Sequence, residues 1–231
     1  MRSATAPARS TSWLRRSSEM AGVLRTGLAF AFLAFALPAG AQDDAQVDAI
    51  IARTKNTRAT YAAYYWNWIT APGQLPVQEW SAEFNDGSRH RVETPGDRII
   101  ANCAERTGTA LFADGRKVTG PNVAGAACGI NTNLSFFSKA YLGQVKTRFG
   151  MADHVRVTDL TNTRTYLVSQ DGIIITSTVA ERTGNGRMLL RLETMALKRS
   201  LPRPDIFSEA SLAASVVPPA RQKAPRGATA R

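Results

Sequence analysis

Helical spacing marks the first structured stretch of the chain. Over residues 43–55, Ala45, Ala49 and Ala52 recur every three to four residues, which predicts an amphipathic helix. From residue 61 onward the period of the apolar positions shortens. Residues 61–70 are rich in aromatic side chains, a composition typical of strands.

Tight turns then recur at short intervals, as in Asp86-Gly87, Pro95-Gly96 and Asp114-Gly115. Connections this short join antiparallel strands, because a parallel crossover needs a dozen or more residues. We therefore expect two antiparallel meanders. Their strands are residues 61–70, 77–84, 89–93, 98–103, 109–112 and 116–119, then 155–160, 164–169, 173–179 and 187–195.

Between the meanders lies a stretch with a different composition. Residues 120–133 are rich in Gly, Ala and Asn and predict an irregular excursion. In residues 134–145 the apolar positions Leu134, Phe137, Tyr141 and Val145 again follow helical spacing, which predicts an inserted helix. The expected fold class is α+β, mainly β: a curved antiparallel meander sheet with both helices packed on its concave face.

The N-terminal region has the pattern of a secretory signal peptide. The apolar run of residues 26–38 follows Arg25 and is shorter than the ~20 residues that a membrane-spanning helix needs. Ala39-Gly40-Ala41 predicts cleavage before Gln42, so residues 1–41 would be removed. A membrane anchor is the alternative, and Met20 is an alternative start. Since no cysteine lies directly after the cleavage site, we expect a periplasmic product without a lipid anchor.

The remaining chain divides into a single β-rich domain, residues 42–212, and a basic, proline-rich tail, residues 213–231, for which we expect disorder. The formal charge of the whole chain is +11. Residues 1–41 carry five Arg and one Glu, so removing them leaves 11 − 4 = +7. For an exported protein this charge suits an anionic membrane surface better than nucleic acid, although a merely arginine-rich surface is an equal alternative.

The two cysteines, Cys103 and Cys128, are expected to form a structural disulfide in an oxidising compartment. The two histidines, His90 and His154, lie in or next to strands, and neither has a triad or metal-ligand pattern around it. The sequence also has no phosphate loop, dinucleotide fingerprint or nucleophile elbow. We therefore expect neither an enzyme nor a cofactor.

Large aromatic and apolar side chains are the strongest candidates for a binding site. In a strand, Tyr64, Trp66 and Trp68 point to one face of the sheet. They either pack as a core or line a hydrophobic cavity. The candidate lining residues are Tyr64, Trp66, Trp68, Trp80, Phe84, Phe137 and Tyr141.

The C-terminal third also carries a family resemblance. Residues 166–176 read Tyr-Leu-Val-Ser-Gln-Asp-Gly-Ile-Ile-Ile-Thr, residues 191–198 read Arg-Leu-Glu-Thr-Met-Ala-Leu-Lys, and residues 201–207 read Leu-Pro-Arg-Pro-Asp-Ile-Phe. This ending resembles the periplasmic lipoprotein-carrier superfamily of LolA-, LolB- and RseB-like proteins. The resemblance implies an incomplete β-barrel with helices over its open side and an apolar cavity between them. The cysteine pair has no counterpart in that pattern.

Taken together, these features predict a soluble, non-catalytic periplasmic carrier, monomeric, for a hydrophobic ligand such as a lipid or a lipoprotein acyl chain. The alternative is a protein-interaction module of the envelope, a stress regulator or assembly factor, which docks through a sheet edge or the basic tail.

Overall fold

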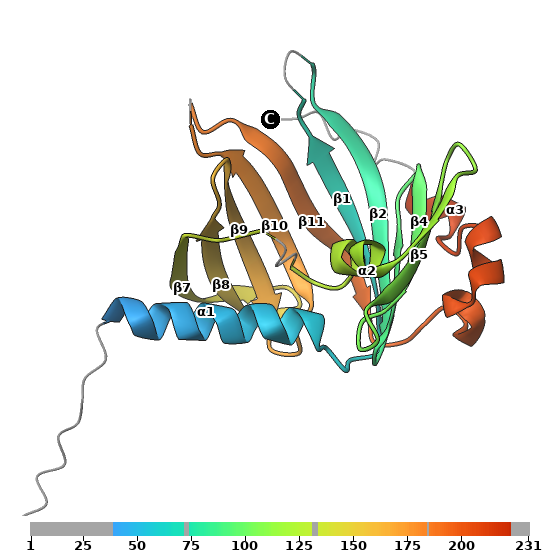
Figure 1. Cartoon of the computed structure of the whole chain (residues 1–231), viewed down its shortest axis with the longest axis horizontal. Helices are drawn as coiled ribbons and strands as arrows, with labels where there is room; N and C mark the ends of the chain where they lie inside the picture. Colours follow the sequence, from blue (N-terminus) through green and yellow to red (C-terminus); the bar gives the residue numbers. More distant parts are fainter. Residues whose placement is uncertain (1–38, 72–73, 131–133, 184, 223–231) are drawn as a thin grey trace, which may run out of the picture. The chain divides into compact units, whose positions relative to one another are not determined.

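A computed structural model of the chain describes residues 39–71, 74–130, 134–183 and 185–222 (Figure 1). Within these residues one antiparallel sheet has eleven strands, in the order β6-β5-β4-β3-β2-β1-β11-β10-β9-β8-β7. The strands are β1 (Tyr61–Ile69), β2 (Val77–Asp86), β3 (Arg89–Glu93), β4 (Asp97–Asn102), β5 (Thr107–Phe112), β6 (Lys117–Thr119), β7 (Ser138–Thr147), β8 (Gly150–Thr158), β9 (Asn162–Ser169), β10 (Ile174–Glu181) and β11 (Met188–Lys198). The helical segments are α1 (Ala39–Lys55), α2 (Pro121–Ala127), η1 (Pro204–Phe207), η2 (Glu209–Ala213) and α3 (Pro219–Gln222).

The strand order follows from two meanders that meet at β1. Short turns pair each strand of β1–β6 and of β7–β11 with its neighbour in sequence, and β1 then pairs with β11 to join the two halves. In the described chain the outermost strands, β6 and β7, do not pair with each other. The sheet is therefore open, and the predicted fold class of an incomplete β-barrel with helices is confirmed.

The helix predicted over residues 134–145 is wrong, because most of that segment belongs to strand β7. The pairing with β8 runs from Ser138 opposite Thr158 to Thr147 opposite Gly150. Phe137, with 57% of its surface exposed, precedes the strand. The apolar positions from Phe137 to Val145 are four residues apart, and this spacing keeps residues on one face of a strand as well as of a helix. Periodicity alone could not separate the two structures.

Helix α2 lies in the segment that was predicted to be irregular. Pro121 starts the helix, a position where proline loses no hydrogen bond. Its buried side chains, Ala124 and Ala127, pack against Ala101 of β4. The predicted disulfide between Cys103 and Cys128 is present, with 5.7 Å between the two Cα atoms, and it ties the C-terminal end of α2 to the residue after β4.

Helix α1 covers the second meander. It begins at Ala39, before the predicted start at residue 43, so the predicted cleavage site before Gln42 falls within it. Its buried side chains Val47, Ile50 and Ile51 pack on one face of strands β8 and β9. The partners on those strands are Val155, Val157, Tyr166 and Val168.

Helices α1 and α2 lie on the same face of the curved sheet, which we call the inner face (Figure 1). The register shows this, because paired residues of neighbouring strands share a face. Tyr166, under α1, pairs with Ser177, which pairs with Leu192, which in turn pairs with Asn67 of β1. Val92, under α2, pairs with Glu83, which pairs with Ala63 of β1. Ala63 and Asn67 are four residues apart and lie on one face of β1.

Two glycines allow the chain to approach the C-terminal turn of α1. Gly172, in the β9–β10 turn, has φ +85°, and a Cβ atom there would lie 2.4 Å from the carbonyl oxygen of Arg53. Gly129, after α2, has φ +68°, and a Cβ atom would lie 2.6 Å from the hydroxyl oxygen of Thr54. That hydroxyl accepts a hydrogen bond from the Ile130 backbone. Glycine is therefore needed at both positions for close contact as well as for backbone conformation.

The C-terminal region differs from the expectation of disorder from residue 213. Ser215 and Val216 bind Glu93, and Val217 is buried. Residues 223–231 of the expected tail, and residues 1–38 of the expected signal peptide, lie outside the described residues. No helix in the described part of the chain has the length and apolar character to span a membrane.

The close approach at Gly172 gives a stability prediction. Replacing Gly172 with Ala should lower the free energy of unfolding by about 2 kcal/mol more than replacing Gly115 with Ala, as measured by urea unfolding. Gly115 is a matched control, since its φ is +81° and a Cβ atom added there would have no atom within 4 Å. Equal losses for the two variants would contradict the contact with α1.

Candidate functional site

Five aromatic side chains of β1 and β2 gather on the outer face of the sheet, opposite α1 and α2, whereas Tyr61 and Tyr65 of β1 lie on the inner face. Tyr64, Trp66 and Trp68 alternate along β1 and share this face, as predicted. Trp66 pairs directly with Trp80 of β2, and the rings of Tyr64 and Phe84 meet edge to face with centroids 5.9 Å apart. The structure thus brings five of the seven candidate lining residues together.

The other two candidates lie elsewhere. Tyr141 of β7 packs beside the α1 cluster, and its hydroxyl donates a hydrogen bond to Asp153 at 3.1 Å. Phe137 is exposed, and its ring lies under the guanidinium of Arg182. Neither residue faces the aromatic side chains of β1, so the shared cavity expected from the sequence is not formed by these seven residues.

A C-terminal segment covers the aromatic face; we call residues 201–217 the strap. Ile206 and Val217 are buried among the aromatic rings, and Leu201, Phe207 and Val216 pack around them. Tyr64, Trp66, Trp80 and Phe84 have at most 9% of their surface exposed. The aromatic face is therefore a filled core, closed by a segment whose last residues, 213–217, were expected to belong to a disordered tail.

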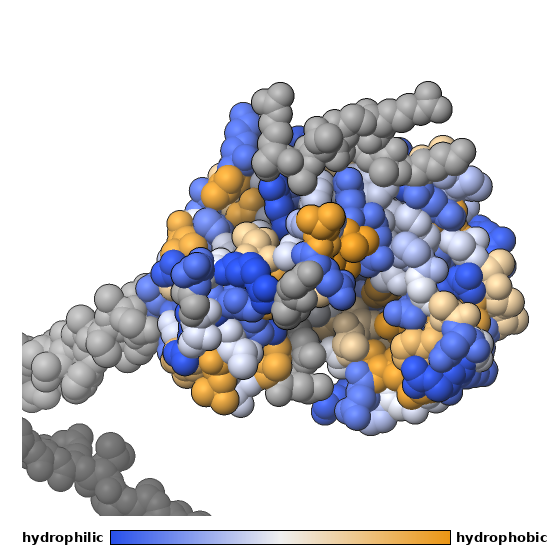
Figure 2. All heavy atoms as spheres, turned by 90° about the horizontal axis from the view of Figure 1, so that it is seen from above, coloured by the Kyte–Doolittle hydropathy of each residue, from blue (hydrophilic) through white to orange (hydrophobic). Residues whose placement is uncertain are grey.

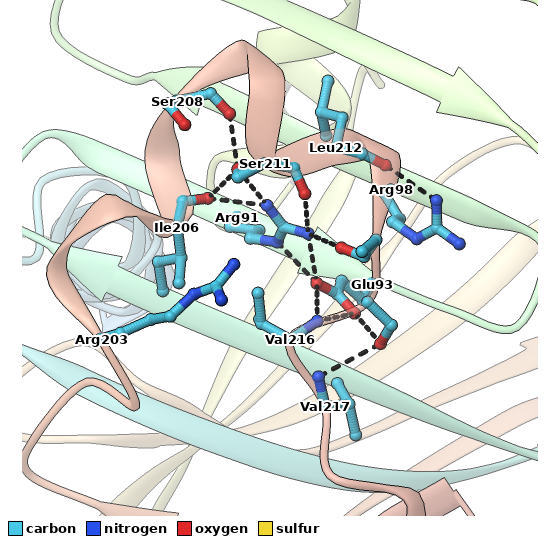
Figure 3. A network of polar contacts seen from close by, with 12 residues as sticks. Arg91, Glu93, Arg98, Arg203, Ile206, Ser208, Ser211, Leu212, Val216 and Val217 are labelled. Carbon is cyan, nitrogen blue, oxygen red and sulfur yellow. Dashed lines mark hydrogen bonds and ion pairs between the residues drawn. The ribbon is translucent and has the colours of Figure 1, made fainter.

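A buried ion pair holds the strap (Figure 3). Arg91 and Glu93 of β3 have no exposed side-chain surface, and the Arg91 Nε donates to Glu93 at 2.6 Å. The Arg91 guanidinium also donates to the carbonyl oxygens of Ile206, Ser211 and Ala214 at 2.7, 3.2 and 3.1 Å.

Glu93 supplies the complementary contacts. Its carboxylate accepts hydrogen bonds from the Ser215 hydroxyl at 2.5 Å and from the Val216 backbone at 3.1 Å. On the neighbouring strand, Arg98 donates to the carbonyl of Leu212 at 2.8 Å (Figure 3). Most of these hydrogen bonds go to backbone atoms of the strap. They therefore determine where the strap runs on the sheet and place few requirements on its side chains. We call Arg91 and Glu93 the latch.

The sequence carries one signal for the latch, an arginine and a glutamate two residues apart in one strand. Arg91 pairs with Phe84, and Glu93 pairs with Ala82, so both charges lie on the apolar face of β2. Two opposite charges two residues apart on a face that is otherwise apolar indicate a buried pair. Burial lowers the pKa of Arg91, and the charge of Glu93 counteracts that effect.

A second polar cluster lies on the inner face. The Glu83 carboxylate accepts hydrogen bonds from the hydroxyls of Tyr61 and Tyr65, and His90 lies 3.2 Å from it. His90 is buried, and its Nδ1 lies 3.2 Å from Asn85. Burial alone would raise the pKa of Glu83, but His90 and the tyrosine hydroxyls outweigh it and lower the pKa. Burial and Glu83 together raise the pKa of Tyr61 well above its usual value.

A third polar centre joins α1 to the second meander. Asp153 of β8 is buried beneath α1 and forms an ion pair with Arg53. Its carboxylate also accepts hydrogen bonds from Tyr141 and Gln144, each at 3.1 Å. Burial would raise the pKa of Asp153, but these donors, Arg53 first, lower it below its usual value.

Open space lies beside the disulfide, where the end of α1 meets α2. One pocket there has a volume of about 350 Å³ and is lined by Ala52, Lys55, Asn56, Cys103, Arg106, Ala124, Gly125 and Cys128. An adjoining pocket of about 460 Å³ shares Lys55, Asn56 and Cys103, and Arg58 adds a further cation. No carboxylate is among the lining residues of either pocket. We call this pair of pockets the junction pocket.

The junction pocket combines apolar walls with positive charge. Burial, and then the charge of Arg106, lowers the pKa of Lys55, so the two cations lie close enough to repel each other. Such a site favours an anion with an apolar part. None of the seven candidate lining residues is among its walls. In the described residues, no group of three or more His, Cys, Asp or Glu could hold a metal ion.

The latch gives a prediction for the outer face. Replacing Arg91 with Met leaves the Glu93 charge buried without its partner and should lower the free energy of unfolding by about 3–5 kcal/mol in urea. Limited proteolysis should then cut the strap. Lys117 and Glu209 form an exposed ion pair that also joins the sheet to the strap, and Lys117→Met should cost less than about 1 kcal/mol. Similar losses for both variants would show that the latch holds the strap no better than a surface pair.

Comparison with known proteins gives structural similarity only. No protein-family model matches the chain, and no curated protein matches its sequence. Among solved structures, a match to an uncharacterized conserved protein from Thermus thermophilus has 16% identity and a TM-score of 0.45, over 77% of this chain and 97% of that one.

Two further solved structures carry descriptive names. MucB has 12% identity and a TM-score of 0.45, over 78% of this chain; the match spans 65% of the MucB chain, less than two thirds of its length. A LolA superfamily protein from Nitrosomonas europaea has 9% identity and a TM-score of 0.40, over 71% of this chain and 98% of that one.

Proposed function

We propose that the protein is a non-catalytic periplasmic carrier that binds a single-chain amphiphile, an acyl chain with an anionic head, in the junction pocket. The observation that carries the proposal is the junction pocket itself, in which apolar walls from α1, α2 and the disulfide stand beside Lys55 and Arg106. The outer aromatic face, which the sequence favoured, is already filled by the strap.

The size and lining of the pocket support this ligand class. Ligand sites typically have volumes of about 300–1,000 Å³, mostly apolar walls and a few charged groups that orient the ligand. Each buried methylene would contribute about 0.8 kcal/mol of binding free energy. The cations would pair with the head group, and their mutual repulsion, which lowers the pKa of Lys55, would be relieved by an anion.

Filling the pocket tests its position. Ala52 is an exposed residue of α1 that lines the pocket, so Ala52→Trp should reduce the uptake of a fluorescent fatty acid at least about tenfold, measured by titration. The matched control is Ala49→Trp, since Ala49 is exposed on the same helix but does not line the pocket. If the wild-type protein takes up no fatty acid, or if both variants take it up normally, the proposal fails.

Removing one cation tests the head group. Arg106 has φ +56°, a conformation that asparagine tolerates, so Arg106→Asn removes the charge without new backbone strain. Uptake of a fatty acid should fall about tenfold, while uptake of the fatty alcohol of the same length should not change. Equal losses for the acid and the alcohol would mean that Arg106 shapes the pocket and does not bind the head group.

A second candidate function is protein binding through the edge of the sheet. Strand β7 is ten residues long, and in the described chain only β8 pairs with it. A free edge of this length can receive an added strand from a partner. A photo-reactive side chain at exposed Leu142 of β7, but not at Val118 of β6, should then cross-link to one protein in cells. Without such a product at Leu142 this candidate is rejected.

A further inference from the structure

The β1–β2 loop, the β10–β11 turn, the β8–β9 turn and the start of β7 lie at the same end of the sheet. The β1–β2 loop is joined to β11 by the hydrogen bond from the Thr70 backbone to Leu189, at 2.9 Å. The β10–β11 turn is joined to the β8–β9 turn by the bond from the Arg182 backbone to Thr161, at 2.8 Å. The Phe137 backbone, before β7, donates to Thr158 at 3.1 Å. These segments therefore lie at the same ends of seven neighbouring strands. In sheet order the strands are β2, β1, β11, β10, β9, β8 and β7.

Large apolar side chains project from this edge. The exposed fractions are 86% for Leu75 and 78% for Leu160, both in loops. The set, which we call the apolar rim, consists of Ile69, Leu75, Val77, Phe137, Leu160 and Met188. The view from above in Figure 2 looks onto this end and shows separate hydrophobic patches among hydrophilic ones. Isolated exposed leucines are ordinary, but six large apolar residues along one edge are not.

Arginines accompany the apolar rim. The guanidinium of Arg182 lies 4.9 Å from the centre of the Phe137 ring and donates to the carbonyl of Leu160 at 3.2 Å. Among the described residues, Arg182 forms no ion pair with a carboxylate. Arg191 lies 5.4 Å from the ring centre of Trp68, and Arg187 pairs with Glu181. Arg191 is also paired, with Glu193, so within the described residues the charge at the rim that no carboxylate balances is that of Arg182, beside Phe137 and Leu160.

We propose that the apolar rim is a docking surface for an anionic phospholipid membrane. Exposed leucines and aromatic rings can enter the boundary between headgroups and acyl chains, while arginines beside them pair with lipid phosphates. Basic residues near the membrane surface add affinity for anionic lipid, and this added affinity decreases as the salt concentration rises. In residues 42–231 the excess of Lys and Arg over Asp and Glu, 29 − 5 = 24 against 18 − 1 = 17, also favours an anionic partner over an uncharged protein surface.

The rim and the junction pocket are independent sites, since they share no residue. Docking through the rim needs no ligand in the pocket. It would place the strand ends at the membrane surface and keep the protein removable, because six side chains insert far less apolar surface than a spanning helix.

Flotation with lipid vesicles tests the proposal, on protein purified after export from cells that express the full chain. The wild type should float with vesicles of about 30% phosphatidylglycerol in phosphatidylcholine, and much less with pure phosphatidylcholine or at high salt. Leu75→Ser with Leu160→Ser should lower the partition coefficient at least about tenfold. Arg182→Gln should lower binding to anionic vesicles and leave the weak binding to neutral vesicles unchanged.

The matched control replaces two apolar residues away from the rim, Val118 and Met151, with Ser; their exposed fractions are 38% and 45%. This variant should bind vesicles like the wild type. Fatty-acid uptake and urea unfolding should be unchanged in the rim variants, which separates this proposal from the carrier function. The proposal is overturned if the wild type does not float with anionic vesicles, if the control variant loses as much binding, or if the rim variants change only self-association in sedimentation.

Discussion

Strand β1 is buried on both faces and hydrogen-bonded along both edges, and this is the constraint that organises the molecule. Its outer side chains require a cover, and so do its inner ones, because an open sheet cannot bury either face by itself. On the inner face, α1 covers β8 and β9, α2 covers β4, and the inner side chains of β1 pack with Ile173 and Ile175. The outer face is covered by the strap. The covers come from three distant parts of the sequence. The sheet therefore depends on contacts that no single meander can provide.

Each cover is attached by an ion pair or by a disulfide as well as by apolar packing. The strap has Arg91 and Glu93, α1 has Asp153 and Arg53, and α2 has the disulfide. Apolar contact is tolerant of sliding, whereas a buried ion pair with directed hydrogen bonds is satisfied in one arrangement only. These attachments select one position for each cover on the sheet.

The sequence predicted most of the sheet because turn residues and alternation are local signals. Asp86-Gly87 and Asp114-Gly115 identify their hairpins without reference to the rest of the chain. It failed for residues 134–145, where a spacing of four residues suits both a strand and a helix. It also failed for the strap, because the charged residues that hold it, Arg91 and Glu93, lie more than 100 residues earlier in the sequence.

Prediction of the candidate site from the sequence failed for the same reason, because the site depends on contacts between distant segments. The sequence correctly placed Tyr64, Trp66 and Trp68 on one face, but it could not reveal what covers that face. The junction pocket was missed because its walls are small or polar residues, such as Ala52, Asn56 and Ala124, which have no distinctive pattern. Only the positions of α1, α2 and the disulfide bring them together. The junction pocket therefore exists only in the folded protein, once α1, α2 and the disulfide are in place.

The strap follows all eleven strands in the sequence, and this order has a consequence for biogenesis. Synthesis delivers residues 201–217 after every strand, so strands β1 to β5 can pair while their outer aromatic face has no cover. The contacts that close this face join residues 115 to 123 positions apart in sequence, and long-range closure of this kind is slow. Until the strap binds, the tryptophans of the outer face and the Arg91–Glu93 ion pair are exposed to solvent and to other proteins. A chain truncated before residue 201 would keep every strand and yet remain a substrate for chaperones and proteases.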